Sequence, residues 1–231
     1  MTRSGRTVWI TRTAPGADRL ASRVREAGFD PVVSSLLGLD PDFRPPGIVL
    51  GDVAALAFTS VNGLAFADLT PRRDWPVFAV GDRTAEAARR RGFTEAVSAG
   101  GDASALAERI AAAWGDRKGV LLAPGAEQPA ADLAGLLAGR VPTRPVAVYR
   151  MIEAATALPE AFDIVLLQSA RAAEALSRRL TPGRAATCIA VAQSPAVAGP
   201  IRALGLAEVR IAAHPTENSL LEALGKAPRP V

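Results

Sequence analysis

The sequence contains few residues of the types from which metal and redox sites are built. Among its 231 residues there is one cysteine, Cys188, and one histidine, His214, and only 5% are aromatic. A single cysteine excludes an intramolecular disulfide and any metal site made of several thiolates. No apolar run reaches the roughly 18–20 residues that a membrane-spanning helix needs. No glycine-rich phosphate loop of the Gly-x-Gly-x-x-Gly or Gly-Lys-Ser/Thr type is present.

These absences lead us to expect a protein without metal, cofactor or membrane contact. Residues Met1–Arg6 run directly into an expected strand and do not resemble a signal peptide, so we expect a cytoplasmic location. The net charge is +4, and nearly all the basic residues are arginines. They reflect either the codon usage of a GC-rich genome or a polyanionic ligand, whose carboxylates match arginine forks. The arginines are scattered and aromatics are few, so we expect no nucleic-acid partner.

Short apolar runs alternate with helical patterns along most of the chain, which predicts parallel sheets with crossover helices. Expected strands are Thr7–Thr11, Ala54–Phe58, Val77–Val80, Glu95–Val97, Gly119–Leu122, Val146–Tyr149, Ile164–Leu167, Thr187–Val191 and Glu208–Ile211. Expected helices are Ala17–Ala27, Thr84–Arg91, Ala103–Trp114, Arg171–Leu180 and Glu217–Leu224.

The chain also contains an internal repeat whose pieces are rotated in order. The segment Val77–Gly81 resembles Cys188–Ala192, and each continues through a helix, a glycine, a short strand and a capped helix. The tetrapeptide Ala-Pro-Gly-Ala follows an early strand at residues 14–17 and a later one at residues 123–126. The strand–helix unit marked by this tetrapeptide therefore comes at the start of the chain in one copy of the repeat. In the other copy it is the last unit.

The repeat predicts an α/β protein of two similar, doubly wound parallel-sheet lobes, with the middle lobe inserted into the other. The expected division is residues 1–32 with 154–231 as one lobe, 40–145 as the second lobe, and 33–39 and 146–153 as the connector between them. The chain passes between the two expected lobes twice. Near both passages it contains residues that favour extended backbone, Pro31–Val33 and Pro145–Tyr149. We expect these two segments to pair as a two-stranded connector.

Several local sequences, in this order and spacing, resemble the uroporphyrinogen-III synthase family over essentially the full length. They are Val8–Arg12, Ala57–Gly63, Ala79–Ala85, Val148–Arg150 and His214–Thr216. The resemblance implies flavodoxin-like lobes. Two loops depart from the family pattern: Ala192–Pro195 replaces a Gly-Pro-Thr-Thr type of loop, and Ala123–Glu127 lacks an arginine that many relatives have there.

The resemblance implies a cofactor-free lyase that acts on hydroxymethylbilane, a linear tetrapyrrole with eight carboxylates. Water leaves the terminal hydroxymethyl group and gives an azafulvene on ring A. Ring D then attacks through its substituted carbon, and the spiro intermediate fragments and recloses with ring D inverted. Such an enzyme must impose one geometry of closure, and two lobes that close over the substrate suit that task. We expect a monomer.

Candidate site residues lie where expected strands end, because open parallel sheets bind ligands at that edge. The substrate-binding candidates are Arg12, Thr59, Ser60, Asn62, Ser169 and Ser194. Thr84 and Tyr149 are the catalytic candidates, and by resemblance the Tyr149 phenol assists departure of the hydroxyl. Each hydroxyl could instead cap a helix, Arg12 could be a solvated surface residue, and Tyr149 could simply pack against a lobe.

The two remaining reactive side chains have structural interpretations. His214 precedes Pro215 and a helix cap, which favours a surface loop, and Cys188 lies in a buried strand pattern. Two other kinds of protein remain as alternatives: a two-lobed anion-binding protein without catalysis, and a phosphosugar-binding enzyme on similar lobes. A secreted binding protein should show a signal peptide, and a phosphosugar enzyme should show a Gly/Ser-rich loop.

Overall fold

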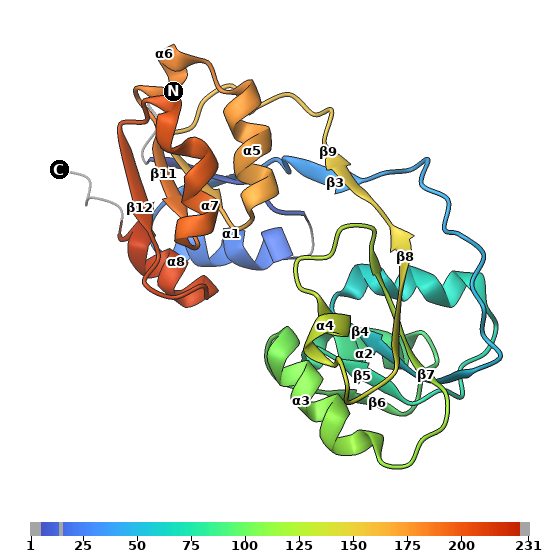
Figure 1. The fold of residues 1–231 in the computed structure, drawn as a ribbon. Coiled ribbons are helices and arrows are strands. Elements are labelled where there is room, and N and C mark those ends of the chain that lie inside the picture. The colour runs from blue at the N-terminus through green and yellow to red at the C-terminus, as the bar shows by residue number, and fades with distance from the viewer. Residues whose placement is uncertain (1–5, 14–15, 227–231) are drawn as a thin grey trace. The chain divides into compact units, whose positions relative to one another are not determined.

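The computed structural model describes residues 6–13 and 16–226, so part of the first Ala-Pro-Gly-Ala tetrapeptide lies outside the described residues. The chain divides into two compact units (Figure 1). Unit 1 contains Met1–Gly38 and Ile152–Val231, and unit 2 contains Leu39–Met151. Among the described helices, none is long and apolar enough to cross a membrane.

Unit 1 contains a five-stranded parallel sheet in the order β12-β11-β10-β1-β2. These strands are β1 (Thr7–Ile10), β2 (Asp30–Val33), β10 (Ile164–Leu167), β11 (Ile189–Ala192) and β12 (Glu208–Ile211). The helices are α1 (Gly16–Glu26), α5 (Ala170–Arg179), α6 (Pro182–Ala185), α7 (Pro195–Ala198), η2 (Gly199–Leu204) and α8 (Glu217–Leu224).

Both faces of this sheet are covered, as the alternation of side chains along β1 shows. Val8 and Ile10 pack with residues of α1 and α8, including Leu20 and Leu220. Trp9, between them in sequence, packs on the opposite side with residues of α5, α6 and α7. Successive side chains of a strand point to opposite faces, so a strand that is apolar throughout is stable only in a sheet covered on both sides.

Unit 2 contains a second five-stranded parallel sheet, in the order β6-β5-β4-β7-β8. Its strands are β4 (Val53–Phe58), β5 (Val77–Ala79), β6 (Ala96–Ser98), β7 (Val120–Ala126) and β8 (Thr143–Tyr149). Its helices are η1 (Val61–Leu69), α2 (Asp82–Arg90), α3 (Ala103–Trp114) and α4 (Leu133–Leu136). Helices η1 and α2 pack on one face with Phe58, and α3 and α4 pack on the other with Ala57.

The two sheets have the same strand order when the pieces of the repeat are rotated. Strands β10, β11 and β12 correspond to β4, β5 and β6, while β1 and β2 correspond to β7 and β8. The prediction of an α/β fold with two doubly wound parallel sheets is therefore confirmed.

A two-stranded connector is present, and its strands lie within the segments 33–39 and 146–153, although Pro31–Val33 and Pro145–Tyr149 do not form it. It consists of β3 (Leu37–Leu39) and β9 (Met151–Glu153), which lie where the chain passes from one unit to the other. The expected pairing of Pro31–Val33 with Pro145–Tyr149 is wrong, because the first segment pairs with β1 as part of β2 and the second pairs with β7 as part of β8. Both are edge strands of the five-stranded sheets, where a proline is tolerated because one side of the strand donates no ladder hydrogen bonds.

Candidate functional site

Three of the candidate residues follow three neighbouring strands of unit 1. Arg12 comes after β1, Ser169 after β10 and Ser194 after β11, and these strands are adjacent in the sheet. Parallel strands end at the same edge, so the structure brings Arg12, Ser169 and Ser194 to the carboxyl edge of the sheet. This edge is where ligands of open parallel sheets bind.

Both serines at this edge are helix N-caps. The Ser169 Oγ accepts a hydrogen bond from the N–H of Ala172 at 3.1 Å, at the start of α5. The Ser194 Oγ accepts one from the N–H of Val197 at 3.4 Å, at the start of the short helix α7. The capping role is therefore present, and it remains compatible with a ligand contact, because a hydroxyl that accepts a hydrogen bond can still donate one.

Arg12 lies in a network of contacts at the same edge. Its carbonyl oxygen accepts a hydrogen bond from the Ser35 hydroxyl at 2.9 Å. Its Nη1 lies 3.5 Å from Oε2 of Glu217, the first residue of α8. Arg12 is therefore ordered at the sheet edge rather than free in solvent.

In unit 2 the candidates gather at the junction of β4 with η1 and at the start of α2. The Ser60 Oγ accepts a hydrogen bond from the N–H of Asn62 at 3.1 Å and caps η1. Thr59 precedes this cap. Thr84 lies in the first turn of α2 with 5% of its surface exposed. Gly81 supplies no side-chain cap to α2, and the N–H groups of Thr84 and Ala85 both donate to its carbonyl oxygen at 3.0 Å.

Tyr149 is the last residue of β8, an edge strand of unit 2, rather than part of a connector as expected from the sequence. Its ring is half-buried against the core that contains Phe58, and its carbonyl oxygen accepts a hydrogen bond from the N–H of Glu127 at 2.9 Å. Within residues 6–13 and 16–226 its hydroxyl makes no hydrogen bond. The backbone is thus anchored, and the hydroxyl is available to a substrate.

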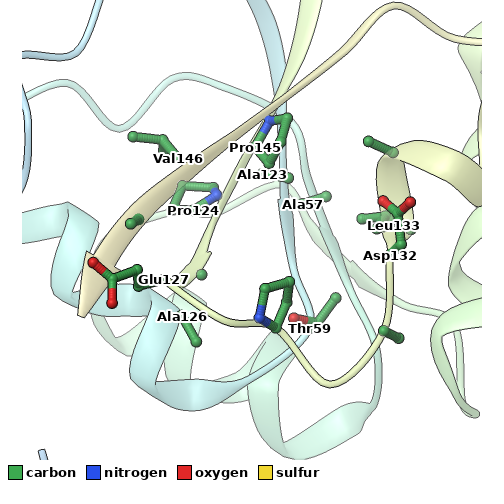
Figure 2. Close-up of a pocket in the computed structure, with 15 residues that line it drawn as sticks. Ala57, Thr59, Ala123, Pro124, Ala126, Glu127, Asp132, Leu133, Pro145 and Val146 are labelled. Atoms are coloured by element: carbon green, nitrogen blue, oxygen red, sulfur yellow. The ribbon is translucent and has the colours of Figure 1, made fainter. Parts of the chain in front are cut away.

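A cavity of about 300 Å³ lies at the carboxyl edge of the unit 2 sheet (Figure 2). Thr59, Pro124, Val146 and Leu133 line it, together with several alanines. Two carboxylates, Glu127 and Asp132, also belong to the lining. Most of the other lining side chains are small and apolar. Sequence analysis did not predict this cavity, although the Ala-Pro-Gly-Ala segment 123–126 was a signal of small residues close to the edge.

The loop that lacks the family's arginine carries a carboxylate instead, and that carboxylate holds a nearby arginine. The Nη2 and Nε of Arg150 donate to the two carboxylate oxygens of Glu127 at 2.7 and 2.8 Å. This bidentate bond is the main cause of a raised pKa of Arg150. Glu127 thus holds Arg150, the residue after Tyr149, in a fixed position. No spacing in the sequence indicated this contact between Arg150 and Glu127.

The remaining reactive side chains lie outside these edges. Cys188 is buried in the core of unit 1, and burial raises the pKa of its thiol to about 12, which disfavours the thiolate form. His214 is exposed in the loop between β12 and α8. In the part of the chain that the structure describes, no group of three or more histidine, cysteine or acidic residues could hold a metal ion.

The sequence matches a family model described as uroporphyrinogen-III synthase HemD over residues 18–222. Solved structures of uroporphyrinogen III synthase from the extremely thermophilic bacterium Thermus thermophilus are similar in fold to this chain. One is 17% identical, with 94% of this chain and 95% of that chain covered and a TM-score of 0.41. A mutant form is 16% identical, with 94% and 96% covered and a TM-score of 0.49. A comparison with curated proteins gave no match.

Proposed function

The chain belongs to the uroporphyrinogen-III synthase family, and on that premise we propose how the residues at its two sheet edges carry out the family's reaction. Members of the family are cyclising lyases of tetrapyrrole biosynthesis, and the substrate is a small tetrapyrrole. The observation that carries this function is the family match, which extends over residues 18–222 and therefore includes parts of both units.

Tyr149 is the proton donor for water loss in this proposal. Its phenol gives a proton to the hydroxyl of the hydroxymethyl group as the C–O bond breaks, so that water departs and an azafulvenium cation remains on ring A. A proton lost from ring D when the aromatic pyrrole is restored balances the one that was donated. Support comes from the anchored backbone of Tyr149 and from its hydroxyl, which makes no hydrogen bond to the described residues.

The substrate-binding residues act through hydrogen bonds to carboxylates. In unit 1, Arg12 binds a carboxylate through its guanidinium, while Ser169 and Ser194 donate their hydroxyl protons. In unit 2, Thr59, Ser60 and Asn62 act in the same way at the end of β4, and Thr84 positions the reacting end of the substrate near the first turn of α2. Many weak contacts of this kind hold a flexible chain in one conformation, which is the requirement for inversion of ring D.

Conversion of hydroxymethylbilane to the type III isomer tests the function. The purified protein is incubated with enzymatically generated hydroxymethylbilane, and the oxidised products are separated into type I and type III isomers. Type III product above the spontaneous type I background is expected. If the substrate binds but yields only type I, the chain is an anion-binding protein without catalysis.

We further propose that the protein acts as a monomer in the cytoplasm without nucleic acid. Support comes from the scattered arginines and the scarcity of aromatic side chains, which are unlike a nucleic-acid surface. Analytical ultracentrifugation of the purified chain tests the monomeric state, and fractionation of cells that express it tests the location.

A further inference from the structure

Three arginine side chains converge on a single carboxylate in unit 1. Glu217 Oε2 accepts a hydrogen bond from Arg19 Nη2 at 2.9 Å and lies 3.5 Å from Arg12 Nη1. Glu217 Oε1 accepts a hydrogen bond from Arg23 Nη1 at 3.0 Å. The other terminal nitrogen of Arg23 donates to Oδ1 of Asn218 at 2.9 Å. We refer to Arg12, Arg19, Arg23 and Glu217 as the guanidinium cluster.

The cluster lies at the carboxyl edge of the sheet, because two of its members come after the ends of strands of that sheet. Arg12 follows β1, and Glu217 is the first residue of α8, after β12. Arg19 and Arg23 are one turn apart on α1, so they lie on the same side of that helix. The cluster therefore shares the edge that Ser169 and Ser194 occupy.

The side chains of the cluster differ in exposure, and the carboxylate is more buried than the guanidinium groups. Only 14% of the Glu217 side chain is exposed, against 63% of Arg19. Burial raises the pKa of Glu217, but the hydrogen bonds from Arg19 and Arg23 outweigh it, so the pKa is lowered and the carboxyl is ionised at neutral pH. Three guanidinium groups and one carboxylate leave a net charge of +2, which faces solvent.

Room for Arg12 in the cluster comes from a glycine. A Cβ atom on Gly16 would lie 2.5–2.6 Å from the Arg12 guanidinium, which is shorter than any real contact. Gly16 is the first residue of α1. The missing side chain at the start of this helix therefore allows the guanidinium to lie beside α1, near Arg19 and Arg23.

Attachment of α1 to the rest of unit 1 does not explain three arginines. Leu20 and Val24 of α1 already share a core with Leu220 and Leu224 of α8. Guanidinium groups held close together repel, and one carboxylate offsets only part of that repulsion. A second anion would offset more of it, and arginine forks fit carboxylates in particular.

We propose that the guanidinium cluster is a subsite for a carboxylate of the tetrapyrrole's acetate or propionate side chains, with Glu217 as the internal carboxylate that the substrate displaces from Arg12 and Arg19. The identity of the ligand in this proposal rests on the proposed function. The position of the subsite rests on the geometry of the cluster. Glu217 keeps the three arginines together before substrate binds, and the ligand carboxylate then accepts hydrogen bonds from the exposed guanidinium of Arg19.

Charge-removing substitutions on α1 test the subsite. Arg19→Gln and Arg23→Gln should each raise KM for hydroxymethylbilane at least about threefold, the effect of one partly exposed charge pair, and leave kcat unchanged. Arg25→Gln is the matched control, because Arg25 is exposed on the same helix and has no ion pair among the described residues. Equal KM values for all three variants and the wild type would overturn the proposal. An equal rise in all three would also overturn it, since the effect would then be one of net charge.

Substitution of the internal carboxylate should act in the opposite direction. Glu217→Gln keeps the size of the side chain and raises the net charge of the cluster to +3, so KM should fall about two- to fivefold while the protein becomes less stable. Glu208→Gln is the control, because Glu208 also pairs with an arginine, Arg210, but lies at the start of β12. A purely structural role of Glu217 predicts a lower Tm without any change in KM, and that result would contradict the proposal.

Direct binding separates the failure of this proposal from failure of the proposed function. Uroporphyrin, an octacarboxylate macrocycle, serves as a fluorescent probe whose affinity is measured without turnover. If the wild type forms no type III isomer, the proposed function fails, and weaker uroporphyrin binding by Arg19→Gln than by Arg25→Gln would still support the subsite. If the wild type is active and the two variants bind uroporphyrin equally, the subsite is wrong and the function stands.

Discussion

Replacement of Tyr149 by phenylalanine separates a chemical role of this residue from a structural one. The substitution removes one oxygen and leaves the ring, which is half-buried against the core containing Phe58. The hydroxyl makes no hydrogen bond to any residue that the structure describes, so no bond within the protein is lost. The hydrogen bond from Glu127 to the carbonyl oxygen of Tyr149 involves only main-chain atoms and should persist.

The two quantities affected by Tyr149→Phe should therefore change by very different amounts. We expect the free energy of unfolding to change by less than about 0.5 kcal/mol, which corresponds to a shift in Tm of about 2 °C or less for a chain of this size. A general acid contributes typically about 10²–10⁴-fold to a rate, so kcat should fall by that factor, equivalent to about 2.7–5.5 kcal/mol in the barrier. KM should change by less than about twofold, because the contact forms mainly in the transition state.

The assay is steady-state formation of type III isomer from freshly generated hydroxymethylbilane, corrected for spontaneous closure to type I. Thermal unfolding, followed by circular dichroism, is measured on the same preparations. A kcat within about twofold of wild type, with Tm unchanged, would show that Tyr149 is an aromatic packing residue and would remove it from the mechanism. A loss of kcat together with a loss of several degrees in Tm would mean that the structural argument about its hydroxyl is wrong.

Four further predictions follow from individual contacts. Cys188 should resist thiol reagents in the native protein at pH 8 and react after denaturation, because burial raises its pKa to about 12; rapid native labelling would contradict this. Gly63→Ala should cost about 1–3 kcal/mol in unfolding experiments, because the new Cβ would lie 2.5 Å from a main-chain carbonyl oxygen, whereas the control Gly51→Ala, with no atom within 4 Å, should be near neutral. Ser169→Ala should lower stability by about 1 kcal/mol through loss of the α5 cap but retain measurable type III activity; complete loss of activity with an intact fold would argue against distributed binding. The Tm deficit of Glu217→Gln should be largest near neutral pH and shrink as pH falls below 4.5, because the folded-state pKa of Glu217 is lowered and its stabilisation is lost on protonation; a deficit that persists at low pH would mean that it arises from packing.

The sequence predicted the bounds of several buried or well-capped elements, for a physical reason. The observed ranges of β10 (Ile164–Leu167), α3 (Ala103–Trp114) and α8 (Glu217–Leu224) coincide with the expected ones. Strand β10 is buried along its whole length, and the other two are amphipathic helices with clear caps. Elements like these are determined by burial and capping, both of which leave a strong pattern in the sequence.

Edge elements left a weaker pattern. Strand β2 contains Pro31 and no fully buried residue, so its sequence does not differ from that of an extended loop. Strand β8 contains Pro145, which made it resemble a connector. Helix η1 is a 3₁₀ helix with Gly63 near its start, and its apolar residues show no helical periodicity. In each case the structure depends on pairing or packing with a segment that is distant in the chain.

The sequence does not distinguish the two roles of the candidate site residues, because capping and ligand binding use the same residue types at the same places. Ser60, Ser169 and Ser194 all accept a hydrogen bond from the first turn of a helix, as sequence reasoning allowed, and this observation neither requires nor excludes a ligand. Glu217 was not singled out because its importance arises only when α1 meets α8, some two hundred residues later in the chain.

Stability and KM are therefore the two measurements that must be made together. Loss of a cap lowers the free energy of unfolding whether or not substrate is present, whereas loss of a carboxylate contact changes KM, and a residue with both roles changes both.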